Sequence, residues 1–534
     1  MFSMQLWFLV ENILSLLVSL PQALVAFVRD WLHFRELANR FPGPPARPIV
    51  GNLFDCGLYP NPLTLIKWII EDVMVRYPAG QIMMGPLRVF LLSEENDVQT
   101  FLMNSKNQSR PKLLADALTY CLGRGLVTIN GKEWSRHHKI ITPSFHQNLL
   151  KTYVTMFDRK SDVFVEKLSE YANGSAFDVQ IMTETLQLDI VIETLLGLPS
   201  NQQTTPDHDM LECISIGQKE ISHRLRSPLL CIDAIYQLSS SGRKAKESLK
   251  WGRNFHNKVL EQRQAILRSK AESLMMKKSL KKDEDTSETP NIVPTDDPNV
   301  NSNKKEFNIL IDALLQERGR SISHESVLDE NLTLTLAGFD TTAIAIQFAF
   351  YFLAKNPHVQ EKAVRELRDI FDAAGSTEVT AKTLQRMQYV DMIVKETLRL
   401  HPPVFFYVKE AGVDTPLVSN NLVVPAGAIV LISPRTMHIN PKLYPDPHVF
   451  DPERFSPENS AKRHPSAFIP FGAGMRACMG RKYAILVLKT VISKVIWNYR
   501  ILPDETYEPN LHWGITMVTD NGMRIKLLKR STSR

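Results

Sequence analysis

The chain has 534 residues, 44% hydrophobic and 22% charged, so it is globular and long enough to bury a large core. The net charge of +6 is spread along the chain rather than gathered in runs beside aromatic residues, which argues against a nucleic-acid-binding protein. The five cysteines are odd in number and include no CxxC pair, which excludes a disulfide framework and indicates a reducing compartment where one thiol can stay free for a metal.

The amino terminus is almost wholly apolar from Met4 to Val28, which is long enough to cross a bilayer. Arginines follow this stretch and no positive charge precedes it, so a retained anchor with a cytosolic body is favoured over a cleaved signal peptide. Glu11 is costly inside a membrane, and a helix buried in the core is the alternative. We expect an N-terminal membrane anchor over residues 1–30.

Two breaks interrupt the rest of the chain. The segment Phe41–Pro45 is rich in proline, which removes backbone donors and restricts the preceding residue, so residues 31–46 should form a stiff hinge. Residues 276–305 are rich in Lys and then in Asp, Glu, Pro, Asn and Ser, which predicts a mobile surface loop. Because there is no internal repeat, we expect one large domain over residues 47–534.

Helical periodicity dominates that domain. The clearest helices are expected at residues 156–171, 249–267, 325–355 and 482–499, and short strands at residues 88–92, 422–424 and 523–528. The fold should therefore be mainly α with small β-sheets.

The helix expected at 325–355 carries the sequence Ala-Gly-Phe-Asp-Thr-Thr at residues 337–342. Threonine hydroxyls inside a helix can bond back to the preceding turn and, with the glycine, loosen the backbone enough to hold a water. A polar turn on a surface helix is the simpler interpretation, but the apolar residues on both sides argue that this turn is buried.

Further along, Glu396 and Arg399 are three residues apart and so share one helical face. Arg454 follows within the sequence Asp-Pro-Glu-Arg-Phe at residues 451–455. Such acid–base pairs are common, so this spacing alone is weak evidence for any function.

The strongest signal is the sequence Phe-Gly-Ala-Gly-Met-Arg-Ala-Cys-Met-Gly at residues 471–480, directly before an apolar helix. Gly474 and Gly480 would let the backbone turn tightly around Cys478 and bring it close to a metal. Backbone N–H groups and the following helix N-terminus then favour a thiolate at Cys478.

This loop resembles the heme-binding loop of cytochromes P-450, F-x-x-G-x-R-x-C-x-G, and meets all five fixed positions. Residues 337–342 resemble the oxygen-activating motif of the same family, A-G-x-D/E-T-T. The resemblance runs in order from about residue 41 to 530 and is closest to the animal family 4 clan, including its insect members, within which this sequence is divergent. It implies the cytochrome P-450 fold.

The resemblance also implies a heme b cofactor whose iron has the Cys478 thiolate as its axial ligand. Arg476 would bind a heme propionate, and Phe471 would pack beneath the porphyrin. On the distal helix, Thr341 would position oxygen and a water while Asp340 relays protons from solvent.

Three further positions resemble heme-propionate contacts. The segment from Gly131 to about Phe145 matches the helix that offers Trp134, but the arginine of that motif is His138 here, and Lys409 stands where many relatives carry another arginine. Neither reproduces the guanidinium fork. The heme should be held without a covalent bond.

In the family pattern, Glu396, Arg399 and Arg454 form a buried ion network with a structural role. Together these features imply a monooxygenase that inserts one atom of dioxygen into a hydrophobic substrate. Since no flavin or nicotinamide module is visible, electrons from NADPH would arrive through a separate cytochrome P-450 reductase, with cytochrome b5 as a second donor. The alternatives are a heme-binding protein with little or no turnover and a reductase-independent lipid isomerase.

The expected location is the endoplasmic reticulum membrane, with the body facing the cytosol. Lipids, hormones and xenobiotics all suit the largely apolar segments that we expect to line the pocket. These segments are residues 114–122, 213–238, 334–337, 404–408 and 513–516.

Overall fold

The computed structural model describes residues 24–55, 62–227, 230, 232–284 and 309–530. The chain divides into two compact units, each built from separated stretches of sequence. The smaller unit comprises Met1–Pro111, Phe406–Leu443 and His464–Ala477, and the larger unit comprises Lys112–Phe405, Tyr444–Arg463 and Cys478–Arg534.

The smaller unit is built on a four-stranded sheet in the order β1-β2-β7-β4. β2 and β7 pair in parallel, with Val89 opposite Ile429, and the other neighbours are antiparallel. The sheet strands are β1 (Ala79–Met84), β2 (Leu87–Leu92), β4 (Tyr407–Glu410) and β7 (Ile429–Ile432), beside a small pair β5 (Thr415–Pro416) and β6 (Val423–Val424). The helices are α2 (Pro62–Trp68), η1 (Ile69–Val73), α3 (Met74–Arg76), α4 (Glu95–Met103), α17 (Pro434–His438), η7 (Pro465–Ala467) and η8 (Gly474–Arg476).

The proline-rich segment expected to be a hinge is fastened to this sheet. The ring of Phe41 is buried and lies 4.9 Å from that of Phe90. The Gln81 amide of β1 donates to the Pro42 carbonyl oxygen at 2.9 Å, and the Gln81 side chain donates to the Phe41 carbonyl oxygen at 2.7 Å. These bonds give the proline-rich backbone the partners that a helix would otherwise supply.

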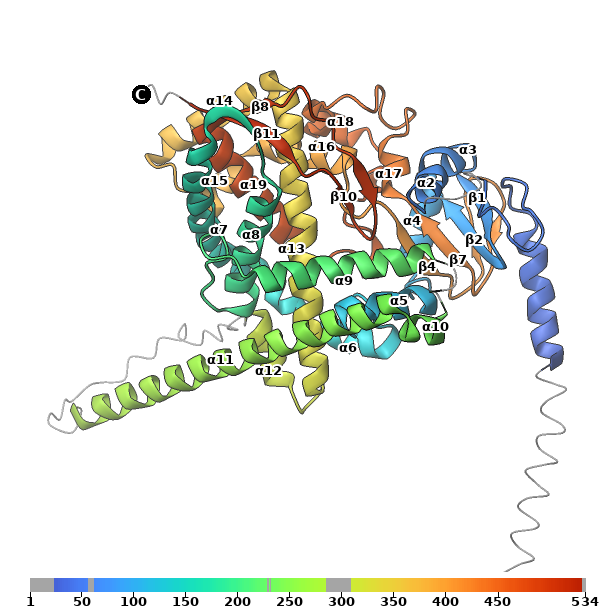
Figure 1. Cartoon of the computed structure of the whole chain (residues 1–534), viewed down its shortest axis with the longest axis horizontal. Coiled ribbons are helices and arrows are strands. Elements are labelled where there is room, and N and C mark those ends of the chain that lie inside the picture. The colour runs from blue at the N-terminus through green and yellow to red at the C-terminus, as the bar shows by residue number, and fades with distance from the viewer. Residues whose placement is uncertain (1–23, 56–61, 228–229, 231, 285–308, 531–534) are drawn as a thin grey trace, which may run out of the picture. The chain divides into compact units, whose positions relative to one another are not determined.

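The larger unit is organised around the long helix α13 (His324–Lys355), which begins where Ser323 accepts a hydrogen bond from the Ser326 amide. α8 packs along α13, and α9 and α11 lie side by side (Figure 1). The other helices are α5 (Lys112–Leu122), α6 (Gly131–Ile141), η2 (Thr142–Phe145), α7 (Gln147–Leu168), η3 (Ser169–Tyr171), α8 (Gln180–Val191), η4 (Ile192–Leu196), α9 (His208–Arg226), α10 (Asp233–Leu238), α11 (Ser240–Glu284), α12 (Leu310–Glu317), α14 (Pro357–Ala374), α15 (Ala381–Arg386), α16 (Gln388–Leu400), η6 (Pro452–Phe455), α18 (Pro457–Ala461) and α19 (Arg481–Asn498).

Two small sheets complete the larger unit. One has the order β3-β11-β8 and the other pairs β9 with β10. Their strands are β3 (Asn173–Asp178), β8 (Tyr499–Pro503), β9 (Leu511–Trp513), β10 (Met517–Thr519) and β11 (Arg524–Lys529). The predicted class, mainly α with small β-sheets, is therefore confirmed.

The start of the expected mobile loop differs from the structure. α11 continues to Glu284, into the stretch expected to be a mobile loop from residue 276. The Leu, Met, Lys and Glu residues of that stretch are strong helix formers, and their charge does not prevent a helix. The rest of the expected loop, residues 285–305, lies outside the described residues.

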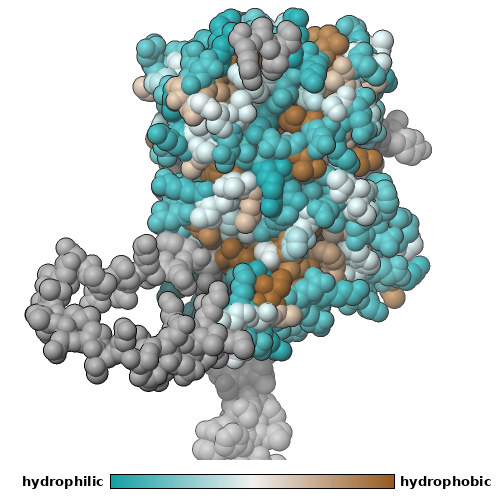
Figure 2. Space-filling model, turned by 90° about the vertical axis from the view of Figure 1, so that its left-hand side faces the viewer, coloured by the Kyte–Doolittle hydropathy of each residue, from teal (hydrophilic) through white to brown (hydrophobic). Residues whose placement is uncertain are grey.

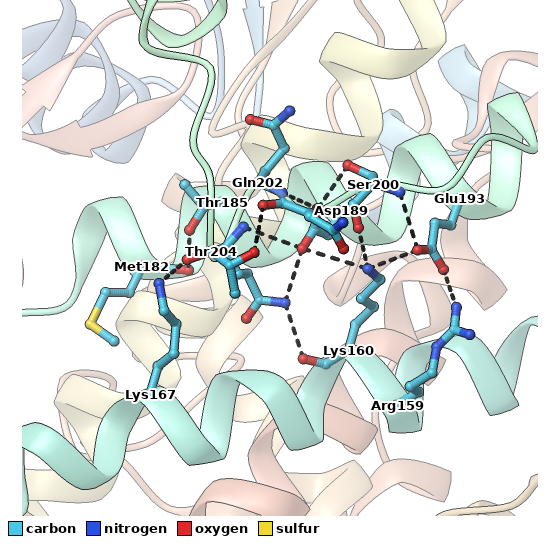
Figure 3. A network of polar contacts seen from close by, with 12 residues as sticks. Arg159, Lys160, Lys167, Met182, Thr185, Asp189, Glu193, Ser200, Gln202 and Thr204 are labelled. Atoms are coloured by element: carbon cyan, nitrogen blue, oxygen red, sulfur yellow. Dashed lines mark hydrogen bonds and ion pairs between the residues drawn. The ribbon is translucent and has the colours of Figure 1, made fainter. Parts of the chain in front are cut away.

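A buried polar network fixes three parts of the larger unit to one another (Figure 3). Lys160 of α7 forms an ion pair with Glu193 of η4 at 2.7 Å. Asp189 of α8 accepts hydrogen bonds from the Ser200 hydroxyl at 2.7 Å and the Gln202 amide at 2.5 Å. These charged side chains hold the loop after α8, and each of them has an ion-pair or hydrogen-bond partner for its charge.

Among the described residues, α13 is the one helix long and apolar enough to cross a membrane, but 67% of its most apolar stretch is buried inside the protein. Most of the expected anchor lies outside the described residues. In its described part, Leu24, Val25, Phe27 and Val28 are exposed. On the face of the body shown in Figure 2, by contrast, hydrophobic residues form small groups among hydrophilic ones.

Candidate active site

The polar turn of α13 lies in the larger unit and is buried only in part: Phe339 and Thr342 are buried, and the other four residues are partly exposed. The Thr341 hydroxyl donates to the Ala337 carbonyl oxygen at 2.8 Å, and the helix is continuous through this turn. The Asp340 carboxyl is hydrogen-bonded by the side chains of Thr516 and Gln218, the latter on α9. Burial raises the pKa of Asp340, and these two bonds act in the opposite direction. An acid of this kind can hold or release a proton next to Thr341.

An apolar cluster lies beside this turn. It joins α5, α9 and α13 through Leu118, Cys121, Ile221, Leu332 and Leu336, with Ile515 packed against it. Four of the five segments expected to line a pocket therefore meet in the larger unit. At the fifth segment, the ring of Phe405 lies 5.1 Å from that of Trp513.

Cys478 lies just before α19, and its sulfur accepts hydrogen bonds from the backbone N–H groups of Gly480 and Arg481. Cys478 is exposed as a residue, yet surrounding protein atoms raise the pKa of its thiol, and the two N–H groups act in the opposite direction. Gly480 has φ −78°, so its backbone does not adopt the left-handed conformation that favours glycine. Gly480 contributes to the site by placing its backbone N–H group within hydrogen-bonding distance of the Cys478 sulfur. The other described cysteines, Cys121 and Cys213, are also free.

The preceding part of the loop belongs to the smaller unit, and there the glycine prediction is confirmed. Gly474 has φ +71°, and a Cβ atom on it would lie 2.0 Å from the Leu102 carbonyl oxygen of α4. Only glycine fits this position. Phe471 and Arg476, on either side of it, are both partly buried.

Arg476 shares the smaller unit with two other basic side chains, the buried Lys409 and the partly buried Arg110; we call these three the basic cluster. Burial lowers the pKa of Lys409 to about 6, and the charges of Arg110 and Arg476 act in the same direction. Burial also lowers the pKa of Arg476 to about 9, helped by the charge of Arg110. Gathered cations of this kind suit a ligand with carboxylate groups.

Sequence reasoning missed Arg110. The Glu410 amide of β4 donates to the Ser109 carbonyl oxygen at 2.9 Å, which brings Arg110 beside Lys409. No local pattern around Arg110 indicates this pairing.

On α6, Trp134 is buried and its ring lies 4.6 Å from that of His138. The two residues are four apart in sequence, so they share one face of the helix and could contact the same ligand. The neighbouring His137, which sequence reasoning did not single out, is buried and its Nδ1 lies 2.6 Å from Glu330 of α13. Two adjacent histidines thus have different environments.

The acid–base pair of α16, Glu396 and Arg399, is buried in the larger unit. Arg399 donates to both carboxylate oxygens of Glu396, at 2.7 and 2.8 Å, and neither side chain is exposed. Arg454 lies 3.5 Å from Glu396 and completes the set. Arg399 also donates to the carbonyl oxygens of Pro447 and Val449, which fastens the segment after α17 to α16.

Comparison with known proteins shows the family to which the chain belongs. The sequence model of the family "Cytochrome P450" matches residues 41–526. Cytochrome P450 4V2 of Rattus norvegicus is 29% identical over 520 residues, which cover 97% of this chain and 94% of the relative. Cytochrome P450 4c21 of Blattella germanica is 30% identical over 491 residues (91% and 92%), and probable cytochrome P450 4aa1 of Drosophila melanogaster is 30% identical over 523 residues (95% and 92%).

The residues present fit the cofactor of this family, heme b with a cysteine thiolate on its iron. The larger unit offers a cysteine sulfur that already accepts two backbone N–H groups. The smaller unit offers the basic cluster, which suits the two propionate groups of a heme. The chain therefore belongs to the cytochrome P450 family, as a divergent relative of its family 4, and is a heme-thiolate monooxygenase.

Proposed function

We propose that Cys478 is the axial ligand of the heme iron and that the protein oxygenates a hydrophobic lipid, hormone or xenobiotic. The observation that carries this proposal is the pair of backbone N–H groups, from Gly480 and Arg481, that point at the Cys478 sulfur. These donors, with the N-terminus of α19, stabilise negative charge on the sulfur. A metal cation held by this sulfur would favour its deprotonated form.

In the smaller unit, the basic cluster would hold propionate groups. In the larger unit, Trp134 and His138 of α6 would also serve as propionate contacts. Arg476 and Arg110 supply rigid guanidinium groups, whereas Lys409 and His138 supply single donors whose charge depends on their surroundings. Phe471 would pack beneath the porphyrin and keep water from the sulfur. Glu396, Arg399 and Arg454 have a structural role, because their hydrogen bonds fix the backbone around Pro447, Val449 and Asp451.

Bound heme supplies the redox chemistry that activates dioxygen. The protein itself delivers protons and holds a water molecule. Asp340 carries the proton, and the Thr341 hydroxyl orients the water. The hydrogen bond from Thr341 to Ala337 supports this role, because it directs the hydroxyl lone pairs away from the helix backbone. Gln218 and Thr516 keep the Asp340 carboxyl in place.

Electrons would come from NADPH through a separate cytochrome P450 reductase, with cytochrome b5 as an additional donor. The protein would be held in the endoplasmic reticulum membrane by an anchor over residues 1–30, with its body in the cytosol. The exposed apolar side chains of residues 24–28 support the anchor.

The test is the spectrum of the reduced carbon monoxide complex. The wild-type protein should show the red-shifted Soret band of thiolate ligation, and Cys478→Ala should lose it. Cys213→Ala, which removes another free thiol, is the matched control and should keep the band. A normal band in Cys478→Ala would overturn the assignment.

A second measurement separates turnover from the two alternatives. With purified reductase, the protein should consume NADPH and oxygenate at least one compound in a screen of fatty acids, steroids, terpenoids and xenobiotics. A heme-binding protein without turnover, or an isomerase that needs no reductase, would give no reductase-dependent product.

A further inference from the structure

Glu330 of α13 is a buried carboxyl group that connects two other parts of the larger unit to this helix. Its Oε1 lies 2.6 Å from Nδ1 of His137 on α6, and the side chains of Glu330 and His137 are 0% and 1% exposed. Its Oε2 accepts a hydrogen bond from the Leu126 amide at 3.0 Å. Because residue 126 lies in the segment that leads into α6, one carboxyl group attaches both this segment and the helix to α13.

Nearby charged groups on the surrounding elements form ion pairs of their own. At 2.7–2.9 Å, these pairs are Asp329 with Arg253 of α11, Glu133 of α6 with Arg124, and Asp312 of α12 with Arg263 of α11. Burial raises the pKa of Glu330, and the charge of Asp329 acts in the same direction, whereas His137 and the Leu126 amide oppose both. His137 is thus the group that balances a charge on Glu330.

A carboxylate closed to water is costly unless a positive charge balances it. The pair of His137 and Glu330 is neutral when it keeps one titratable proton, either as an imidazolium with a carboxylate or as a neutral ring with a carboxylic acid. Removing this proton leaves a net negative charge next to Asp329. Nε2 of His137 has no hydrogen-bond partner in the part of the chain that the structure describes, so the ring is attached through Nδ1.

We propose that His137 and Glu330 share one proton and that this proton holds α6 against α13, which makes both of them positioning residues for heme. The inference rests on the proposed function, in which Trp134 and His138 of α6 contact heme propionate groups. If α6 moves away from α13, these two contacts move with it. Heme retention should therefore depend on pH.

The direction of this dependence follows from the protons that each state binds. When α6 separates from α13, water reaches both groups, and they titrate near the usual pKa values of 4.5 for the carboxyl group and about 6.5 for an imidazole. Between these values both states hold one proton, and the attachment is strongest. Above about pH 6.5 only the attached state keeps the proton, so each further pH unit favours separation by up to about tenfold. Below about pH 4.5 the separated state binds a second proton, and the attachment weakens again.

The rate of heme release measures this attachment. The heme-loaded full chain is mixed with excess apomyoglobin, and the Soret absorbance gives the release rate constant at about pH 6 and about pH 8.5. Each variant is compared with the wild type at the same pH, so that the titration of other groups, such as Lys409, affects both proteins alike.

Glu330→Gln keeps the size of the side chain and removes the need for the shared proton. Its carbonyl oxygen can accept the Leu126 amide while its NH2 group donates to Nδ1 of His137, so the new pair is neutral without an added proton. The release rate constant relative to the wild type should therefore fall about fivefold or more between pH 6 and pH 8.5. His137→Leu leaves Glu330 buried without its partner, so it should release heme about threefold faster or more at both pH values.

Glu133→Gln is the matched control. Glu133 lies on the same helix and also connects it to the segment before α6, but Glu133 and its partner Arg124 are 34% and 65% exposed. Since an exposed ion pair contributes little, both release rate constants should stay within about twofold of the wild type.

A ratio for Glu330→Gln that is the same at both pH values would overturn the shared proton, because a role in packing alone does not change with pH. If Glu330→Gln takes up no heme, urea midpoints of the heme-free full chains carry the comparison. The midpoint of Glu330→Gln should then rise relative to that of the wild type between pH 6 and pH 8.5, and an unchanged difference would overturn the proposal. A wild-type protein that never acquires a thiolate-type spectrum would instead contradict the proposed function.

Discussion

Replacing Glu396 by Gln would test the buried network on α16. The substitution keeps the size and shape of the side chain but replaces one carboxylate oxygen with an NH2 group. Both oxygens of Glu396 accept bonds from Arg399, and one also accepts the Asp451 amide at 2.8 Å. In Glu396→Gln, an amide donor therefore faces another donor, and the charge of Arg399 is left without its counter-ion in a site closed to water.

The expected loss is large. Removing one partner of a buried ion pair typically costs about 3–5 kcal/mol, against a total stability of roughly 5–15 kcal/mol for a folded domain. It corresponds to about two to four powers of ten in the unfolding equilibrium. Arg399 retains its bonds to the carbonyl oxygens of Pro447 and Val449, so we expect the lower half of this range.

Urea denaturation of the heme-loaded protein, followed by tryptophan fluorescence, gives the transition midpoint. Glu396→Gln should lower the midpoint and the yield of heme-loaded protein. Lys395→Gln is the matched control on the same helix, since Lys395 pairs with Asp391 at 2.8 Å while 34% exposed, and it should cost at most about 0.5 kcal/mol. Equal midpoints for the two variants would refute the reasoning.

Thr341→Ala should bind heme and consume NADPH but divert more of the oxygen to hydrogen peroxide, as a peroxide assay measures; unchanged coupling would assign Thr341 to packing. Because Ala337 has no carboxylate to form an ester with a heme methyl group, acidic organic extraction should release all of the heme, and any heme left on the polypeptide would contradict this. Burial raises the pKa of Glu184 from 4.5 to about 7, so the unfolded chain loses this proton first and stability falls as pH rises from about 4.5 to 7. Glu184→Gln should be more stable than the wild type in urea at pH 8 and equal to it near pH 4.5. Burial lowers the pKa of His256 from 6.5 to about 3, so stability is lost as pH falls through that window, and His256→Leu should show a weaker acid dependence in the same assay.

Sequence reasoning predicted the local structure where that structure depends on a few adjacent residues. The helix of residues 324–355, the turn containing Thr341, and the pair Glu396 and Arg399 all depend on contacts between residues three or four apart. Helical geometry alone brings such residues together. The loop before α19 is also continuous in sequence, although the backbone angle of Gly480 could not be read from the motif.

What the sequence did not reveal depends on long-range pairing. Arg110 joins the basic cluster only because Ser109 pairs with Glu410, about three hundred residues later in the chain. His137 is distinguished from His138 only by Glu330, which lies 193 residues away.

The parallel pairing of β2 with β7 also has a consequence for how the protein is made. Val89 and Leu92 acquire their partners, Ile429 and Ile432, only after most of the chain has left the ribosome. Contacts of such high sequence separation form slowly, because a long loop must close before they are gained. The basic cluster forms only when β4, which carries Lys409, pairs with β7, so Arg110 has no Lys409 beside it during most of synthesis. We therefore expect heme to be acquired late, after translation is nearly complete.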